Sequence, residues 1–165
     1  MKKTLIAVAL FLAAASVFAQ QQGTIDFKET ACIPGGEMPL MTVTTHDEGT
    51  LRAYFRKVGT ADWCSVDGIN KHGVADIILP KFENGEEIEY YFVVLDGDRV
   101  MAKSPKLYRS KALDHCDSPA ARHTMLLTLQ CLPPAQNPMA SSLAAGYAAK
   151  SSEPHPVSPE SPAQQ

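Results

Sequence analysis

The stretch EEIEYYFVVLDGD, residues 86–98, decides the fold class. Side chains alternate between the two faces of a β-strand, which divides this stretch into two sets. The set expected to face the core is Ile88, Tyr90, Phe92 and Val94. The opposite set is Glu89, Tyr91, Val93 and Leu95, which is unusually apolar for a solvent face. We therefore predict a central strand that is mainly core, with a second side suited to docking.

Other segments with strand-like alternation surround this stretch. They are 40–46, 51–58, 63–66 and 74–80. Turn residues such as Asn84-Gly85 separate them, and Asp96-Gly97 predicts a two-residue hairpin into the next strand. Short strands spaced about ten residues apart favour an all-β sandwich over a helical or α/β fold.

Residues 1–19 have the pattern of a cleaved signal peptide. Lys2 and Lys3 precede an apolar run, and Val17 and Ala19 occupy the small-residue cleavage positions. The run is shorter than the roughly 20 residues that a membrane-spanning helix needs, so we expect no stable transmembrane span after cleavage. Losing the two lysines would change the formal net charge from −3 to −5. This acidic balance argues against a nucleic-acid partner.

The composition changes at Pro133. Residues 133–165 hold seven of the twelve prolines and few large apolar side chains. Such a segment buries too little apolar surface to offset its ordering entropy, so we predict a disordered tail. One folded domain, residues 20–132, remains.

The four cysteines, Cys32, Cys64, Cys116 and Cys131, all follow residue 19. An even number of cysteines in a small exported protein indicates two disulfides rather than a metal site. Four cysteines allow three pairings, and their spacing does not choose among them.

The segments 51–67, 74–98 and 103–105 together resemble the immunoglobulin-like or fibronectin type III-like modules of exported bacterial proteins. The shared features are an aromatic-arginine strand end, a strand closing in Ile-Leu-Pro, the Tyr-Tyr strand ending in aspartate, and a following Ser-Pro. The resemblance covers about residues 36–112. It implies an immunoglobulin-like antiparallel β-sandwich and says little about activity, because this fold serves many roles. Such modules often place an aromatic residue where this chain has Cys64.

The resemblance also has implications for individual residues. In that fold the first and last strands are parallel neighbours, which favours Cys32–Cys116 and leaves Cys64–Cys131 as the second pair. The core-facing Tyr90 would tie its hydroxyl to a neighbouring loop, as a tyrosine corner does. The single tryptophan, Trp63, is expected to be a buried plug rather than a sugar-stacking platform.

Residues with catalytic potential are not arranged in a recognisable motif. The histidines His46, His72, His115 and His123 lack the local spacing of metal ligands. The cluster of carboxylates Glu86, Glu87 and Glu89 indicates the solvated start of a strand rather than the pair of catalytic carboxylates of a hydrolase. We therefore predict no catalytic residue, no metal and no cofactor.

One candidate interaction face remains. If strands 51–58 and 87–95 are antiparallel neighbours, their outward side chains form a single surface. That surface is Arg52, Tyr54, Arg56, Glu89, Tyr91 and Val93. Tyrosine and arginine often anchor interfaces, but cross-strand Arg–Glu pairs also occur on a self-contained surface. Residues 121–130 are the one segment expected to be able to cover it.

Taken together, these features predict an exported, non-catalytic binding or envelope-assembly module, periplasmic or secreted from a bacterium. Its partner would be an envelope protein or a glycan. The alternatives are an accessory domain that modulates a partner enzyme or transporter and, ranked lower, a small metal-dependent hydrolase that uses the histidines.

Overall fold

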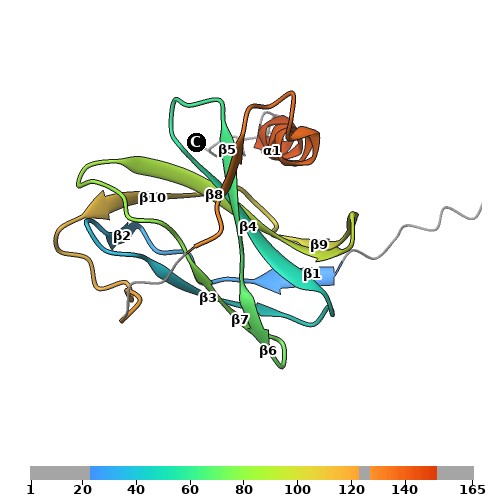
Figure 1. The fold of residues 1–165 in the computed structure, drawn as a ribbon, viewed down its shortest axis with the longest axis horizontal. Helices are drawn as coiled ribbons and strands as arrows, with labels where there is room; N and C mark the ends of the chain where they lie inside the picture. The colour runs from blue at the N-terminus through green and yellow to red at the C-terminus, as the bar shows by residue number, and fades with distance from the viewer. Residues whose placement is uncertain (1–22, 123–126, 152–165) are drawn as a thin grey trace, which may run out of the picture.

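The computed structural model describes residues 23–122 and 127–151 (Figure 1). The predicted signal peptide, residues 1–19, lies outside them. In the described ranges we find no helix that is long and apolar enough to cross a membrane. Within these ranges the structure is mostly strand with one helix, which confirms the all-β class.

The elements follow one another along the chain as eleven strands and a final helix. They are β1 (Gly23–Asp26), β2 (Cys32–Pro34), β3 (Leu40–Thr45), β4 (Thr50–Lys57), β5 (Trp63–Asp67), β6 (Ile69–Lys71), β7 (Val74–Ile78), β8 (Glu87–Asp96), β9 (Arg99–Lys103), β10 (Tyr108–Leu113), β11 (Gln130–Leu132) and α1 (Pro138–Ser151). The strands predicted from alternation correspond to β3, β4, β5, β7 and β8. The short strands β2, β6 and β11 have three residues each, too few to show a period.

Strand β8 is the central strand, as predicted. It pairs antiparallel with β4 along its length, from Thr50 opposite Leu95 to Lys57 opposite Ile88. Its other edge pairs with β10 in the first half and with β9 in the second. Gly97, at a φ of 57°, makes the predicted hairpin turn into β9. All eight interior residues of β8 are buried, so both of its faces are covered.

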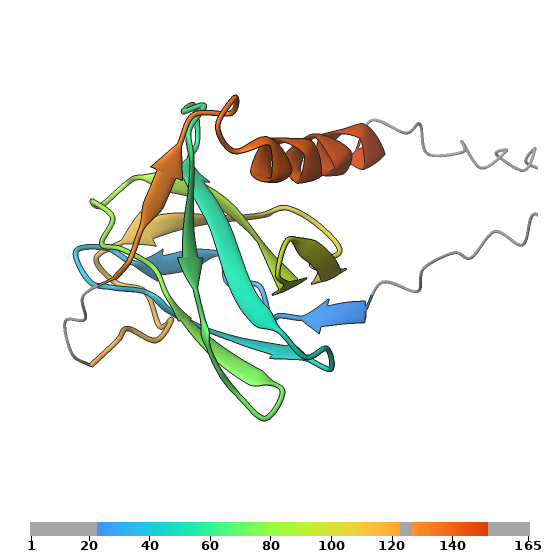
Figure 2. The same cartoon turned by 45° about the vertical axis from the view of Figure 1, so that its right-hand side comes forward.

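The strands form two layers that β1 connects (Figures 1 and 2). One layer runs β11-β5-β4-β8 and continues into β9 and β10, and the other runs β3-β7-β6. The first residues of β1 pair with β9, and Ile25 and Asp26 pair with β3. The main core lies between the layers and includes Leu51, Phe55, Ile77 and the predicted inward set of β8.

The prediction of disorder from residue 133 onward is wrong for residues 138–151, which form α1. Asn137 caps the helix, because its side-chain oxygen accepts a hydrogen bond from the backbone N–H of Ala140 at 3.3 Å. Pro138 follows at the first helical position, where its missing N–H costs nothing. Residues 152–165 lie outside the described part of the chain.

The two disulfides are Cys32–Cys116 and Cys64–Cys131, which confirms the pairing that the resemblance implied. Strand β2 runs parallel to β10, with Cys32 opposite Lys111, so the chain after β10 returns close to Cys32. Cys131 lies directly opposite Cys64 in the β11–β5 pair. Two disulfides fit a protein of an oxidising extracellular or periplasmic compartment.

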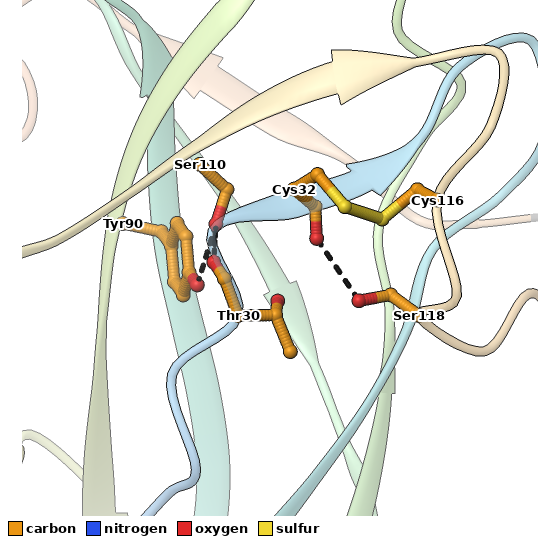
Figure 3. Close-up of a disulfide and its surroundings, with 6 residues drawn as sticks. All are labelled: Thr30, Cys32, Tyr90, Ser110, Cys116 and Ser118. Carbon is orange, nitrogen blue, oxygen red and sulfur yellow. Dashed lines mark hydrogen bonds between the residues drawn. A yellow bond between two sulfur atoms is a disulfide. The ribbon is translucent and has the colours of Figure 1, made fainter.

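The hydroxyl of Tyr90 ties β8 to β10 and, through it, to the segment before β2 (Figure 3). Ser110 donates its hydroxyl hydrogen to the carbonyl of Thr30 at 2.7 Å. Because that hydrogen is committed, the Tyr90 hydroxyl is the donor in its 3.1 Å contact with Ser110 Oγ. The partner of Tyr90 is therefore a strand serine rather than the loop that we expected. Nearby, Ser118 donates to the carbonyl of Cys32 at 2.9 Å beside the disulfide.

This relay predicts unequal costs for two substitutions. Ser110→Ala would leave both the Tyr90 hydroxyl and the Thr30 carbonyl without this partner, and we expect a loss of about 1–3 kcal/mol in the free energy of unfolding. Tyr90→Phe keeps the Ser110–Thr30 bond and should cost about 0.5–1.5 kcal/mol. Urea denaturation of the two variants measures the difference. A larger loss for Tyr90→Phe would contradict the assigned direction of the relay.

Candidate functional site: the aromatic face beneath the C-terminal helix

The β4–β8 pair assembles the predicted interaction face. Its register sets Arg52 opposite Val93, Tyr54 opposite Tyr91 and Arg56 opposite Glu89. Strands 51–58 and 87–95 are thus antiparallel neighbours, as predicted.

An aromatic cluster occupies the middle of this face. The rings of Tyr54 and Tyr91 stack with centroids 5.3 Å apart, and Trp63 of β5 meets Tyr91 edge-on at 5.2 Å. Val93 and Leu95 extend the cluster along β8. We call these five residues, Tyr54, Trp63, Tyr91, Val93 and Leu95, the aromatic face. Trp63 is buried, as expected, but on the outer side of its layer rather than between the layers.

This face is not open to solvent, because α1 covers it (Figure 2). Its role as an interaction face stays a prediction. Tyr91 donates a hydrogen bond from its hydroxyl to the carbonyl of Ala140 at 2.8 Å. Tyr147 packs against Tyr91 with ring centroids 5.5 Å apart and donates to the carbonyl of Ser104 at 2.8 Å. An exposed surface of tyrosine, tryptophan and valine would leave apolar area in water, and docking of α1 removes it.

The segment expected to cover the face, residues 121–130, does not do so. Leu127 packs instead against the core between the layers, and residues 123–126 lie outside the described part of the chain. The covering helix could have been found from two signals. Asn137-Pro138 is a helix start, and Met139, Leu143 and Tyr147 recur every four residues. The proline content of the region hid both.

The contacts of α1 with the face involve few large side chains. Ala140 and Tyr147 are buried, while Met139, Leu143 and Ala144 are partly buried. Among residues 139–147, the exposed ones are small, namely Ser142, Ala145 and Gly146. Tyr147 is the one large side chain of that range that is buried, so we expect α1 to have a lower free energy of local opening than the strands beneath it.

A row of charges borders the aromatic face. The carboxylate of Glu89 is 3% exposed and accepts hydrogen bonds from Arg56 at 2.5 Å and Arg109 at 3.2 Å. The guanidinium of Arg56 also lies 4.6 Å from the centroid of the Trp63 ring. The expected cross-strand Arg–Glu pair is therefore present between Arg56 and Glu89.

Arg52, the remaining member of the predicted face, points to a different partner. It binds Asp67 of β5 through two hydrogen bonds of 2.6 and 3.0 Å. This ion pair raises the pKa of Arg52 above its ordinary value. It also lines a cavity of about 440 Å³ at the open side between β5 and β6, together with Asp76 and Leu127.

The other residues with catalytic potential are dispersed. His46, His72 and His115 are exposed, and His123 lies outside the described residues. Across residues 23–122 and 127–151 there is no group of three or more His, Cys, Asp or Glu side chains able to hold a metal ion. Glu86 pairs with Lys57, and this contact lowers the pKa of its carboxyl. Glu86 and Glu89 thus face different partners.

Burial shifts the titration of the tyrosines. It raises the pKa of Tyr91 well above its usual range, and the neighbouring Tyr54 and Tyr147 add to the effect. Burial also raises the pKa of Tyr147, and it raises those of Tyr90 and Tyr108 to about 12. The folded protein therefore keeps these phenols protonated where an unfolded chain would ionise them.

Stability should consequently fall at alkaline pH. Below about pH 10 the phenols are protonated in both the folded and the unfolded state, so their contribution to the free energy of unfolding does not change with pH. Between about pH 10 and pH 12 the unfolded state loses protons that the folded state retains, and each such tyrosine should lower the free energy of unfolding by on the order of 1 kcal/mol per pH unit. Denaturation curves measured from pH 8 to 12 check this. Tyr147→Phe should give a shallower decline, and an unchanged slope would contradict the role of Tyr147.

Comparison with known proteins identifies no relative of this chain: no known protein family matches it, and no curated protein shows significant similarity.

Proposed function

We propose that this protein is an exported, non-catalytic binding module of the immunoglobulin-like class, and that its aromatic face binds a helical segment of an envelope protein in competition with α1. The pattern of residues 1–19 and the two disulfides support export into an oxidising compartment. The proposal assigns no catalytic residue, metal or cofactor.

Two features of the topology support the immunoglobulin-like class. Strand β1 begins beside β9 in one layer and ends beside β3 in the other. Strand β2, near the start of the chain, pairs parallel with β10, the last strand of the sandwich before β11. Parallel pairing of an early strand with the strand that ends the sandwich is close to the arrangement that the resemblance implies.

The observation that carries the binding role is an aromatic face covered by a weakly anchored helix. Tyrosine and tryptophan are the residue types that most often contribute large binding energies at interfaces. A flat sheet face that accepts α1 through Ala140, Ala144 and Tyr147 is suited to other helices with the same spacing of small and apolar side chains. The partner is therefore expected to present a helix rather than an extended peptide or a sugar.

Competition with α1 lowers the apparent affinity of the aromatic face for a partner. A helix joined to its own site by a short linker competes at an effective concentration in the millimolar range. A partner binds with an affinity reduced by the fraction of molecules in which α1 is undocked. Loosening α1 should therefore strengthen partner binding without any change in the face itself.

Ala140→Glu and Ala145→Glu form a matched pair for testing this proposal. Ala140 is fully buried against the aromatic face, so a glutamate there should displace α1, whereas Ala145 is exposed on the same helix. Both variants add the same charge to the same helix. Trp63 is the only tryptophan, so its fluorescence reports directly on the covering of the face.

We expect a synthetic peptide of residues 137–151 to bind Ala140→Glu and to restore the Trp63 emission of the unaltered protein. The unaltered protein and Ala145→Glu should bind the peptide at least about tenfold more weakly, because α1 occupies their site. The Ala140→Glu variant should also retain an envelope protein that Ala145→Glu does not. Equal peptide binding by all three folded proteins, or retention of a glycan in place of a protein, would contradict the proposal.

A further inference from the structure

We propose that the Cys64–Cys131 disulfide is a thiol–disulfide exchange site whose reduction by an exported dithiol oxidoreductase undocks α1. This inference rests on the proposed function in one respect, namely that uncovering the aromatic face permits partner binding. The exchange site itself depends on the position and the exposure of the disulfide, whatever the aromatic face binds.

The disulfide Cys64–Cys131 holds β11, the strand that leads from the sandwich into α1 (Figure 2). Strand β11 is a three-residue strand that lies at the edge of its layer, beyond β5. A turn over residues 133–137, with a hydrogen bond from the N–H of Gln136 to the carbonyl of Pro133, connects β11 to α1. Through its disulfide with Cys64, Cys131 attaches the chain segment that leads into α1 covalently to β5.

Accessibility favours this disulfide for exchange. Cys131 is exposed on the edge strand, whereas Cys64 is partly buried and packs against the main core. Exposed disulfides are the more labile and regulatory ones, because exchange requires a thiolate to reach a sulfur atom. Cys116, by contrast, is partly buried, and the segment after it bonds back to β2 through Ser118.

The exchange proceeds in two balanced steps. A thiolate of the oxidoreductase attacks the sulfur of Cys131, the Cys64–Cys131 bond breaks, and Cys64 leaves as a thiolate that takes up a proton. The second thiolate of the oxidoreductase then attacks the first oxidoreductase sulfur, which is bonded to Cys131 in the mixed disulfide. Cys131 is released as a thiolate and takes up a proton. Two electrons pass to this protein, and the oxidoreductase becomes a disulfide.

Reduction would leave the sandwich in place. Strand β5 still pairs with β4 from Arg52 opposite Asp67 to Phe55 opposite Cys64. Within the described residues, the buried members of the main core end at Ala112, before β11 and α1 begin. The segment that loses its covalent link is therefore the segment that covers the aromatic face.

The expected effect of reduction on α1 can be bounded from the length of its tether. With the disulfide, Asn137 is six residues from the attachment at Cys131. Without it, β11 is held to β5 by hydrogen bonds alone. When that pairing opens, the next backbone hydrogen bond toward the N-terminus among the described residues runs from the N–H of Ala121 to the carbonyl of Met38, sixteen residues before Asn137. Lengthening a flexible tether in this proportion lowers the effective concentration of α1 roughly fourfold.

Two measurements on the full chain test the inference. Titration with a dithiol, followed by alkylation and peptide mapping, should reduce Cys64–Cys131 at a dithiol concentration at least about tenfold below that for Cys32–Cys116. Hydrogen exchange should then show the amides of residues 139–147 exchanging at least about fourfold faster while β8 stays protected. Reduction of both disulfides together, or unchanged exchange in α1, would overturn the inference.

A variant pair separates this inference from the proposed function. Cys64→Ser with Cys131→Ser should reproduce the faster exchange of α1 without a reductant, and Cys32→Ser with Cys116→Ser should not. If α1 exchanges faster but the 137–151 peptide does not bind, the exchange site stands and the proposed function fails. If the peptide binds Ala140→Glu but reduction leaves α1 protected, the proposed function stands and the exchange site fails.

Discussion

Strand β8 pairs with β4 on one edge and with β9 and β10 on the other, and eight of its ten residues are buried. A strand that is apolar on both faces requires two covers, since each large side chain left in water forgoes about 1.5–3 kcal/mol. The second layer covers the face that carries Phe92, and α1 covers the face that carries Tyr91. The two covers differ in strength. One is a hydrogen-bonded sheet, and the other is a single helix at the end of the domain.

The asymmetry of the two covers connects the fold to the proposed function. The helix offers mainly small side chains, and its attachment to the face relies on Tyr147 and on the hydrogen bond from Tyr91 to Ala140. Such a cover protects apolar surface in the isolated protein, and in the function that we propose a competing helix displaces it. The buried Glu89 joins β8 to its neighbours β4 and β10 through Arg56 and Arg109, and these ion pairs do not involve α1.

The two disulfides act on different parts of this arrangement. Cys32–Cys116 joins the segment after β10 to β2 and closes the sandwich near its chain ends. Cys64–Cys131 holds an edge strand of three residues and, through it, the helix. In the unfolded chain both close long loops and both restrict conformational entropy. In the folded chain Cys32–Cys116 joins strands of the sandwich. Cys64–Cys131 fixes the start of the segment that connects the sandwich to α1.

The sequence by itself determined the all-β class, the central position of β8 and its two sets of side chains, because a period of two residues and turn dipeptides are local signals. The register that sets Tyr54 opposite Tyr91 came from the tertiary structure. It also carried the helix start at Asn137-Pro138, which the surrounding prolines obscured. The tertiary structure alone decided that α1 covers the aromatic face and that Leu127, in the segment expected to do so, packs against the core between the layers. That outcome depends on which apolar surface lies within reach of the chain after Cys131, a long-range property that no local pattern encodes.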